Sequence, residues 1–203
     1  MIRNKIYFIF LLLIIKPGFC QQNDYSWPLP DNWVEEFIPF PLKFAPELNY
    51  HGIEEIHFMP GWRGNDSLSD QRWSYTFAWY LDTLIYFNEE RLQKDLIIYF
   101  DGLQNWVQKN SLGYIPLNVP PEIRIKRAGK NESQKFSGTA EILDIFFTNK
   151  PIRLNMKISL LMDLQVGKTL VLFELSPKPF RHPTWKLLDD HISEFKIKGL
   201  SDS

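Results

Sequence analysis

The chain has 203 residues, of which 44% are hydrophobic and 23% are charged, and this composition excludes an intrinsically disordered protein. Its formal net charge is −1 and no basic stretch is clustered, so nucleic acid is not expected as a partner. Aromatic residues make up 15% of the chain, which predicts either a bulky core or a ring-lined binding face.

Residues 1–20 have the pattern of a secretory signal peptide. Two basic residues, Arg3 and Lys5, precede ten consecutive apolar residues at positions 6–15. A membrane-spanning helix needs about 20 apolar residues, so this run is too short for a transmembrane anchor. We expect cleavage after Cys20. Lipid attachment through Cys20 is the alternative, which the large preceding residue disfavours.

Cleavage at this point leaves residues 21–203, which we expect to form a single domain without any cysteine. The signal peptide holds three basic residues and no acidic ones, so the mature net charge is −4. An exported chain without disulfides has to be stabilised by its hydrophobic core. The sequence thus predicts a periplasmic or secreted protein with no transmembrane segment after cleavage.

Residues 21–50 are rich in proline and aromatic side chains. Five prolines rule out a long helix here, although Asp31 could cap a short helical turn reaching Phe37. We expect the remainder to run extended over the domain surface and to bury four rings. These rings belong to Trp27, Trp33, Phe37 and Phe40.

Residues 72–81 alternate large and small side chains, as expected for a β-strand. The large side chains are Trp73, Tyr75, Phe77, Trp79 and Leu81, and between them lie Ser74, Thr76 and Ala78. Exposing four large rings to water would forgo several kcal/mol, so we expect this aromatic row to pack under a helix. The alternative is a ligand-binding wall, because a face of small polar residues can floor a cavity.

The neighbouring segments complete this layer. Residues 53–59 alternate as a strand, and turn-forming residues predict a loop at 60–71. Residues 88–107 predict a helix with Asn88 as a natural N-cap, and Gly102 could end this helix early. The apolar stripe of this helix runs through Leu92, Leu96, Tyr99, Leu103 and Trp106.

The second half of the chain returns to period-two hydrophobicity. The predicted strands are 122–127, 138–147, 152–160 and 169–175. Pro183 then opens a final helix with an apolar stripe. The stripe consists of Trp185, Leu188, Ile192 and Phe195. Adjacent strands with short connections favour an α+β domain, with two helices packed on a mainly antiparallel sheet of about six strands.

Glu55 and His57 are candidates for chemistry. They share strand parity with His51, so the Glu55 and His57 side chains should project side by side. Such a pair could be part of a metal site or a general acid and base, whereas the ordinary alternative is a solvated strand face. Spacing assigns no third and fourth ligand, so neither a metal nor a cofactor is expected. His182 and His191, nine residues apart, should point to different sides of the final helix.

Two loops combine proline, arginine and tryptophan and are candidate binding surfaces. Trp62 and Arg63 lie in the first loop, and Arg181 and His182 lie in the second. Rigid prolines, a planar cation and an exposed ring suit recognition. The alternative, which we favour, is that Trp62 and Trp185 plug the ends of the core while the arginines are solvated. The sequence contains no nucleophile elbow, phosphate-binding loop or zinc-type cysteine pair.

The same two loops resemble the paired signatures FxPGW…WSYxFxW and FxLSPxPxxHPxW of exported bacterial proteins of similar length that have no known activity. The resemblance implies an exported bacterial domain and adds nothing about catalysis. We interpret the chain as a ligand- or partner-binding domain of the cell envelope, whose partner is a small ligand, an envelope polymer or a protein. The alternative is a periplasmic or secreted hydrolase, with Glu55 and His57 as the acid–base pair and Arg63 holding an anionic group.

Overall fold

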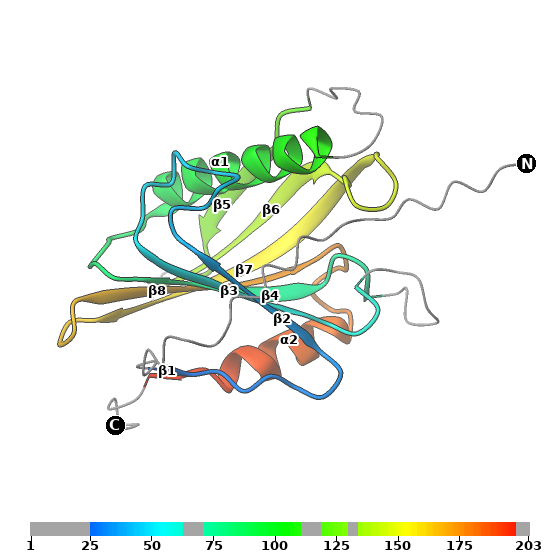
Figure 1. Ribbon diagram of the computed structural model, residues 1–203. Helices are drawn as coiled ribbons and strands as arrows, with labels where there is room; N and C mark the ends of the chain where they lie inside the picture. The colour runs from blue at the N-terminus through cyan, green and yellow to red at the C-terminus, as the bar shows by residue number, and fades with distance from the viewer. Residues whose placement is uncertain (1–24, 63–70, 111–118, 130–133, 198–203) are drawn as a thin grey trace, which may run out of the picture.

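The computed structural model describes residues 25–62, 71–110, 119–129 and 134–197, so the expected signal peptide lies outside the described residues. Within them the fold is α+β, with two helices, a seven-stranded antiparallel sheet and a separate two-stranded pair (Figure 1). The small pair joins β1 (Tyr25–Ser26) to β9 (Lys196–Ile197). Among the described residues, no helix is both long enough and apolar enough to cross a membrane.

The large sheet is the middle layer of the molecule. Its strand order is β2-β3-β4-β8-β7-β6-β5, and every neighbouring pair is antiparallel. The strands are β2 (Val34–Pro39), β3 (Gly52–Phe58), β4 (Tyr75–Leu81), β5 (Glu122–Arg127), β6 (Lys135–Leu143), β7 (Pro151–Asp163) and β8 (Lys168–Ser176). The long helix α1 (Glu89–Lys109) covers one face, and the short helix α2 (Thr184–Ser193) covers the other (Figure 1).

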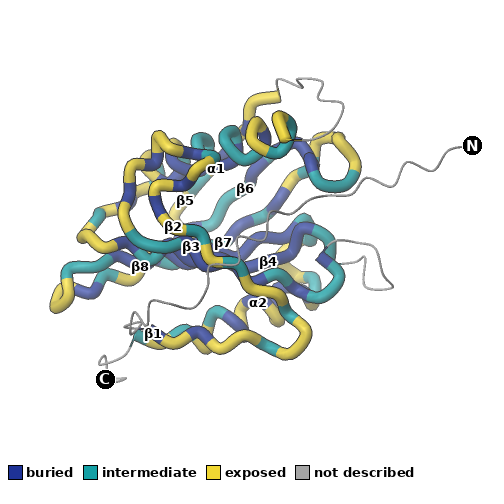
Figure 2. Tube along the Cα trace, in the orientation of Figure 1, coloured by how far each residue is buried: buried dark blue, intermediate teal, exposed yellow. Residues whose placement is uncertain are grey.

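The face toward α1 carries the main core. Phe77, Trp79 and Leu81 of β4 are fully buried there, and Figure 2 shows most of β4 in dark blue. The Phe77 ring stacks on Tyr99 of α1 at 5.5 Å between centroids and on Phe173 of β8 at 4.2 Å. The prediction that the aromatic row packs beneath a helix is therefore confirmed, and a ligand-binding wall on this face is not found.

The opposite face is covered by α2 together with the two ends of the described chain. Ser74 and Thr76 are fully buried and Ala78 is nearly so. Tyr25 and Trp27, from the segment at β1, pack against Ala78 and the neighbouring strand β8. The small side chains of β4 thus make room for aromatic rings rather than flooring a cavity.

Helix α1 begins as predicted, and the alternative of an early end at Gly102 is wrong. The Asn88 side chain accepts a hydrogen bond from the Arg91 backbone N–H at 2.8 Å, which is the expected N-cap. Gly102 does not end the helix, which continues to Lys109. A Cβ at Gly102 would lie 2.1 Å from the Phe44 carbonyl oxygen. The glycine therefore allows the chain before β3 to approach the helix closely.

The Pro-rich segment contains a strand that the sequence analysis missed. The predicted helical turn between Asp31 and Phe37 is wrong, because Val34–Pro39 pairs along its whole length with β3. Trp27 and Phe40 are buried as predicted, whereas Trp33 is half-buried and Phe37 is 41% exposed. This edge strand raises the sheet from about six strands to seven.

Two further strand boundaries differ from the prediction. Strand β6 ends at Leu143 rather than 147, because Asp144 turns the chain. The Asp144 Oδ1 accepts hydrogen bonds from the Phe147 backbone N–H at 3.1 Å and from the Trp73 indole at 2.8 Å. Trp73 precedes β4 with φ of 59°, so its ring reaches the core from a turn and not from the strand.

Candidate functional site

Glu55 and His57 project from β3 toward α2, side by side as their spacing predicts. The His57 Nε2 lies 2.8 Å from Glu55 Oε1. A carboxylate oxygen only accepts hydrogen bonds, so Nε2 carries the proton that links the two side chains. The expectation of a solvated strand face is wrong, because His57 is fully buried and Glu55 is 4% exposed.

The segment at β1 covers this pair. The Tyr25 hydroxyl donates to the second Glu55 oxygen, Oε2, at 2.5 Å. Burial, followed by the nearby Glu55 carboxylate, raises the pKa of Tyr25, so this phenol remains a donor. The Trp27 ring stacks on His57 at 4.2 Å and on His191 of α2 at 4.8 Å. These contacts hold both carboxylate oxygens and both imidazole rings in fixed positions.

His191 extends the network from the sheet to α2. Its Nε2 lies 2.7 Å from His57 Nδ1, so one of these two nitrogens donates to the other. Burial, together with the neighbouring His57, lowers the pKa of His191 to about 3. His191 is therefore neutral near pH 7. Its remaining nitrogen, Nδ1, is buried without a hydrogen-bond partner among the described residues.

A row of polar side chains continues from His57 across the sheet. Cross-strand neighbours place His57 beside Thr76, Thr76 beside Glu174, and Glu174 beside Lys157. Burial, followed by the nearby Asp189 of α2, raises the pKa of Glu174 to about 8. Within the described part of the chain, Thr76 Oγ1 and Glu174 Oε2 have no hydrogen-bond partner. Polar groups thus concentrate under α2, where the covering helix is short.

Glu54, the residue before Glu55, faces the opposite way into the core under α1. It accepts hydrogen bonds from the Trp79 indole at 3.0 Å and from the Tyr99 hydroxyl at 2.9 Å. Its burial is complete and raises its pKa to about 8, although these donors lower it. Glu54 is therefore mostly protonated at neutral pH and belongs to the core rather than to the candidate site.

A groove of about 410 Å³ lies between the chain segment before β2 and helix α2. Its lining residues are Pro28, Leu29, Pro30, Trp33, Leu187, Asp190, His191 and Glu194. Leu29 and Leu187 are 38% and 48% exposed, so the groove offers apolar surface to solvent. The lining holds two acidic residues and neither Lys nor Arg. His191 therefore connects the buried network to an apolar groove with an acidic rim.

The predicted site residues do not converge. Trp62 is buried against Phe58 in the α1 core, with 4.2 Å between ring centroids, which agrees with the core-plugging alternative. Arg181 is exposed, and His182 Nδ1 lies 2.9 Å from Thr184 Oγ1 at the start of α2.

The hydrolase hypothesis also names Arg63, and His51 shares the strand parity of Glu55 and His57. Arg63 lies outside the described residues, and the exposed His51 stands before β3. Neither Glu55 nor His57 lines the groove between residues 28–33 and α2, and neither lines the larger hollow on the α1 side.

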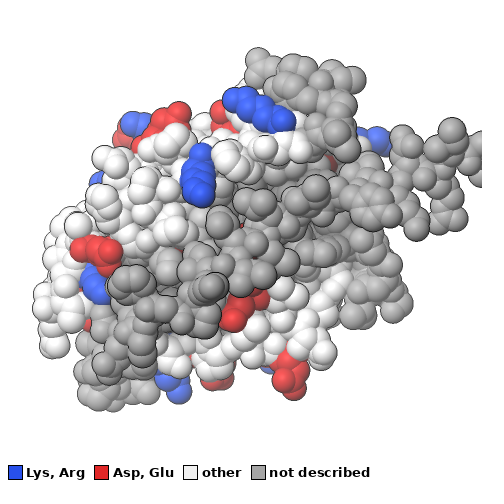
Figure 3. Space-filling model, in the orientation of Figure 1, with Lys and Arg blue, Asp and Glu red and all other residues white. Residues whose placement is uncertain are grey.

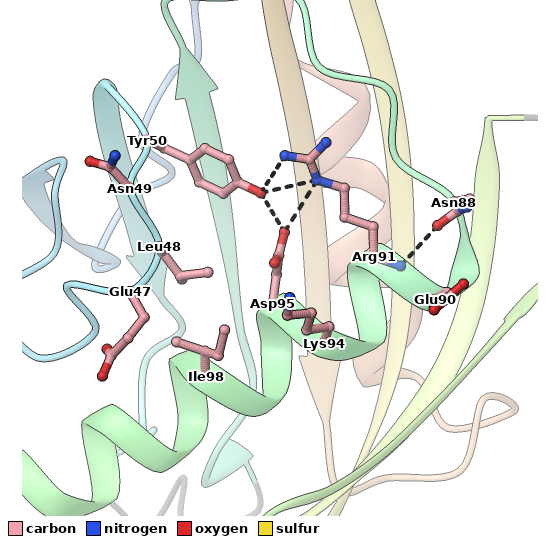
Figure 4. Close-up of a pocket in the computed structure, with 10 residues that line it drawn as sticks. All are labelled: Glu47, Leu48, Asn49, Tyr50, Asn88, Glu90, Arg91, Lys94, Asp95 and Ile98. Carbon is pink, nitrogen blue, oxygen red and sulfur yellow. Dashed lines mark hydrogen bonds and ion pairs between the residues drawn. The ribbon is translucent and has the colours of Figure 1, made fainter.

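A larger open hollow, of about 680 Å³, lies between the chain before β3 and helix α1, away from the network of Glu55, His57 and His191. Figure 4 shows the side chains of Tyr50, Arg91 and Asp95 converging there. The Tyr50 hydroxyl donates to Asp95 Oδ2 at 2.5 Å and accepts from Arg91 Nη2 at 3.2 Å. Because these groups satisfy one another, we interpret the hollow as the place where the chain before β3 is fastened to α1. The apolar groove remains the better candidate for binding.

The surface charges support no single large patch on the face shown in Figure 3. Blue and red side chains of the described residues stand there in small, separate groups. Electrostatic recognition on this face would therefore depend on local pairs of charges rather than on a broad field.

Sequence reasoning missed Tyr25, Glu35 and His191 as members of the network. Tyr25 and His191 are far from Glu55 and His57 along the chain, so no spacing rule connects them. Glu35 joins the network because β2 pairs with β3, which places Glu35 directly opposite His57. That pairing was hidden because the segment was interpreted as a helical turn.

No family model matches the chain, and no curated protein matches it. Among solved structures, the chain is similar to the crystal structure of the Saccharomyces cerevisiae Ran-binding protein Mog1p, with 10% identity and a TM-score of 0.40. The similarity covers 88% of this chain and 92% of that chain. A TM-score this low carries no argument about what the chain binds or does.

Proposed function

We propose that the protein is an exported binding domain that holds a partner protein at the groove between residues 28–33 and α2. The partner segment carries an apolar side chain next to basic residues. The observation that carries this proposal is the composition of the groove, which combines exposed leucines with two acidic residues and no basic one. Export rests on the basic, then apolar, then small-residue pattern of residues 1–20.

The apolar part of the groove explains binding strength. Leu29 and the half-buried Trp33 line the groove from the segment before β2, and Leu187 lines it from helix α2. Removing apolar surface from water is worth about 25 cal/mol per Å², so one inserted side chain would contribute a few kcal/mol at most. Such a site suits a specific side chain and not a broad surface.

The acidic rim explains the expected sequence preference. Asp190 of α2 and Glu194, the C-cap residue of this helix, lie about one helical turn apart and line the same groove. Asp190 also pairs with the exposed Lys186 at 2.5 Å, which leaves Glu194 as the less neutralised of the two. Lysine or arginine beside the inserted side chain would be attracted, and acidic residues there would be repelled.

A hydrolase that uses Glu55 and His57 gains no support from this geometry. General acid–base catalysis requires a side chain within hydrogen-bond reach of the substrate. The ring nitrogens of His57 face Glu55 and His191, and its side chain is fully buried. His191 is the member of the network that lines the groove, and it is held by stacking against Trp27.

The test is a selection of random ten-residue peptides, displayed on phage, against the immobilised mature chain. We expect enrichment of peptides with Leu, Phe or Trp flanked by Lys or Arg. Leu187→Asp should weaken their binding at least tenfold, whereas Leu164→Asp should leave it unchanged. Leu164 is the matched control, because it is 69% exposed and lies in the turn between β7 and β8, outside the groove.

The binding proposal fails if the selection enriches nothing, if the enriched peptides are acidic, or if they bind Leu187→Asp as tightly as the parent chain. Export is tested separately by the intact mass of the protein from its natural host. A mass that begins at residue 21 supports it, and a mass that retains residues 1–20 contradicts it.

A further inference from the structure

Three metal-binding side chains meet on the outer edge of the network, and the proposed binding groove does not include them. Glu35 of β2, Glu55 and His57 each offer one ligand atom, and these atoms lie within 4.8 Å of one another. The register explains the meeting, because Glu35 is paired with His57, and Glu55 lies two residues along the same strand face. We infer that Glu35, Glu55 and His57 form a binding site for a divalent transition-metal ion, with Zn²⁺ as the preferred ion.

The ligand types favour Zn²⁺ over the harder cations. Imidazole and carboxylate groups are common ligands of Zn²⁺, whereas Ca²⁺ and Mg²⁺ are bound almost entirely through oxygen. Two glutamates also balance the charge of one divalent ion, so a bound ion would leave this half-buried site neutral. Three protein ligands would leave one position of a tetrahedral ion for water.

The distances require only a small movement. Ligand atoms around a tetrahedral Zn²⁺ lie about 3.4 Å apart, as metal–ligand distances of about 2.0–2.1 Å dictate. The His57 Nε2 and Glu55 Oε1 are 2.8 Å apart, so their hydrogen bond has to break and the two atoms have to separate by about 0.6 Å to admit the ion. Glu35 is exposed, so its side chain can rotate toward the other two.

The groups behind the ligands match what a metal site needs. The Tyr25 hydroxyl holds Glu55 Oε2, which leaves Oε1 for the ion. The nitrogen of His57 that faces away from Glu55 contacts His191 Nε2 at 2.7 Å. A metal-binding histidine usually donates its second N–H to such a neighbour, which fixes the ring.

Proton positions stay balanced when the ion binds. In the metal-free chain, His57 carries its proton on Nε2, toward Glu55. An ion on Nε2 requires that proton on Nδ1, from which it is donated to His191 Nε2, and His191 then carries its own proton on Nδ1. Each imidazole keeps one proton and only changes the nitrogen that bears it.

The test is a titration of the mature, tag-free, chelator-treated chain with ZnCl₂, followed by calorimetry. We expect one Zn²⁺ per chain and at least a tenfold loss of affinity in Glu35→Gln. Glu35 is exposed, so this variant should fold normally. The matched control is Glu122→Gln, an exposed glutamate on β5 at the other edge of the sheet, which should bind Zn²⁺ like the parent chain.

Two further variants sharpen the result. Tyr25→Phe removes the donor to Glu55 and should weaken Zn²⁺ binding about tenfold, as loss of a supporting group does at other metal sites. His51→Gln removes an exposed histidine and should have no effect. X-ray absorption of the Zn²⁺-loaded chain should show one imidazole and otherwise oxygen ligands.

The inference is overturned if no stoichiometric Zn²⁺ binding is found, if Glu35→Gln binds as tightly as Glu122→Gln, or if the absorption spectrum lacks an imidazole ligand. Failure of the peptide-binding proposal would leave this result unaffected. Leu187→Asp, which tests the groove, touches none of the three ligands and should retain full Zn²⁺ affinity.

Discussion

The two faces of the sheet bury polar groups in different ways. Under α1, Glu54 has hydrogen-bond donors from the Trp79 indole and the Tyr99 hydroxyl and is surrounded by aromatic rings. Under α2, three buried polar atoms have no partner in the described residues. They are Thr76 Oγ1, Glu174 Oε2 and His191 Nδ1. The fourth such atom, Arg72 Nε, belongs to a side chain that lies over Phe147 at the border of the main core. Unsatisfied polar groups are therefore concentrated under α2, as they often are in functional regions.

The covering elements differ as well. Helix α1 has 21 residues and is closed at its start by Asn88, whereas α2 has ten residues and no side-chain N-cap bond. The second face is completed by β1 and β9, which pair through only two residues each. Local opening of the second face should therefore cost less free energy than opening of the first.

The largest expected effect comes from breaking the α1 face. Trp79→Ala should lower the free energy of unfolding by about 3–5 kcal/mol, because it removes a fully buried ring and leaves a cavity. Urea denaturation of the mature chain measures this change. Leu164→Ala, at a residue that is 69% exposed, should stay within about 0.5 kcal/mol of the parent. A loss below about 1.5 kcal/mol for Trp79→Ala would contradict the assignment of this face as the main core.

The two faces should contribute alike to pH dependence. Burial raises the pKa of both Glu54 and Glu174 from 4.5 to about 8, so between these pH values the folded chain holds protons that the unfolded chain has lost. The contribution of each glutamate to the free energy of unfolding is fully present below pH 4.5 and is lost as the pH rises toward 8. Each contributes a slope of up to about 1.4 kcal/mol per pH unit in this window.

Glu54→Gln and Glu174→Gln should each reduce that slope relative to the parent chain, as measured by urea denaturation at several pH values. Glu54→Gln also loses about one hydrogen bond, because an amide cannot accept from both the Trp79 and Tyr99 donors. Its stability should therefore be lower at acid pH but less sensitive to pH. Unchanged slopes in both variants would show that neither carboxyl is protonated in the folded chain.

Hydrogen exchange compares the two faces directly. We expect amides of α2 to exchange with an opening free energy about 2 kcal/mol or more below that of the central turns of α1. The reason is the shorter helix and the two-residue pairing of β1 with β9. Equal protection of both helices would mean that the molecule opens as a single unit.

The smallest effect concerns single hydroxyl groups under α2. Thr76→Val removes a buried hydroxyl without a partner and should change stability by less than about 1 kcal/mol, in the stabilising direction. Ser74→Ala removes a hydroxyl that bonds to Ser176 at 2.9 Å and should cost about 1 kcal/mol. Thermal denaturation of both variants gives the comparison, and a marked destabilisation by Thr76→Val would indicate that its hydroxyl is engaged.

Much of the α1 face could be predicted from the sequence because its signals are local. Period-two rings at 75–81 and the Asn88 cap each act within one element. The edge strand β2 could not be predicted, since Glu35, Glu36 and Pro39 make its pattern unlike a buried strand. The role of Gly102 could not be predicted either, because the close approach of Phe44 is not visible in a local pattern.

The candidate site was predictable only in part. The contact between Glu55 and His57 follows from their spacing on one strand. Their burial does not follow from the spacing, because the covering residues Tyr25, Trp27 and His191 lie near the two limits of the described residues. Sequence spacing describes neighbours within an element, whereas this site depends on which distant elements meet. The resemblance to exported bacterial proteins stays a prediction.

The pairing of β1 with β9 makes the molecule a candidate for circular permutation. Tyr25 stands directly opposite Ile197 in an antiparallel pair, so a linker of a few residues could join these two positions, which limit the described residues. New termini could then be opened at the turn around Gly167, where a Cβ would meet no atom within 4 Å. In that rearranged chain, the covalent link would replace the two-residue pairing of β1 with β9 beside the residues that cover His57 and His191.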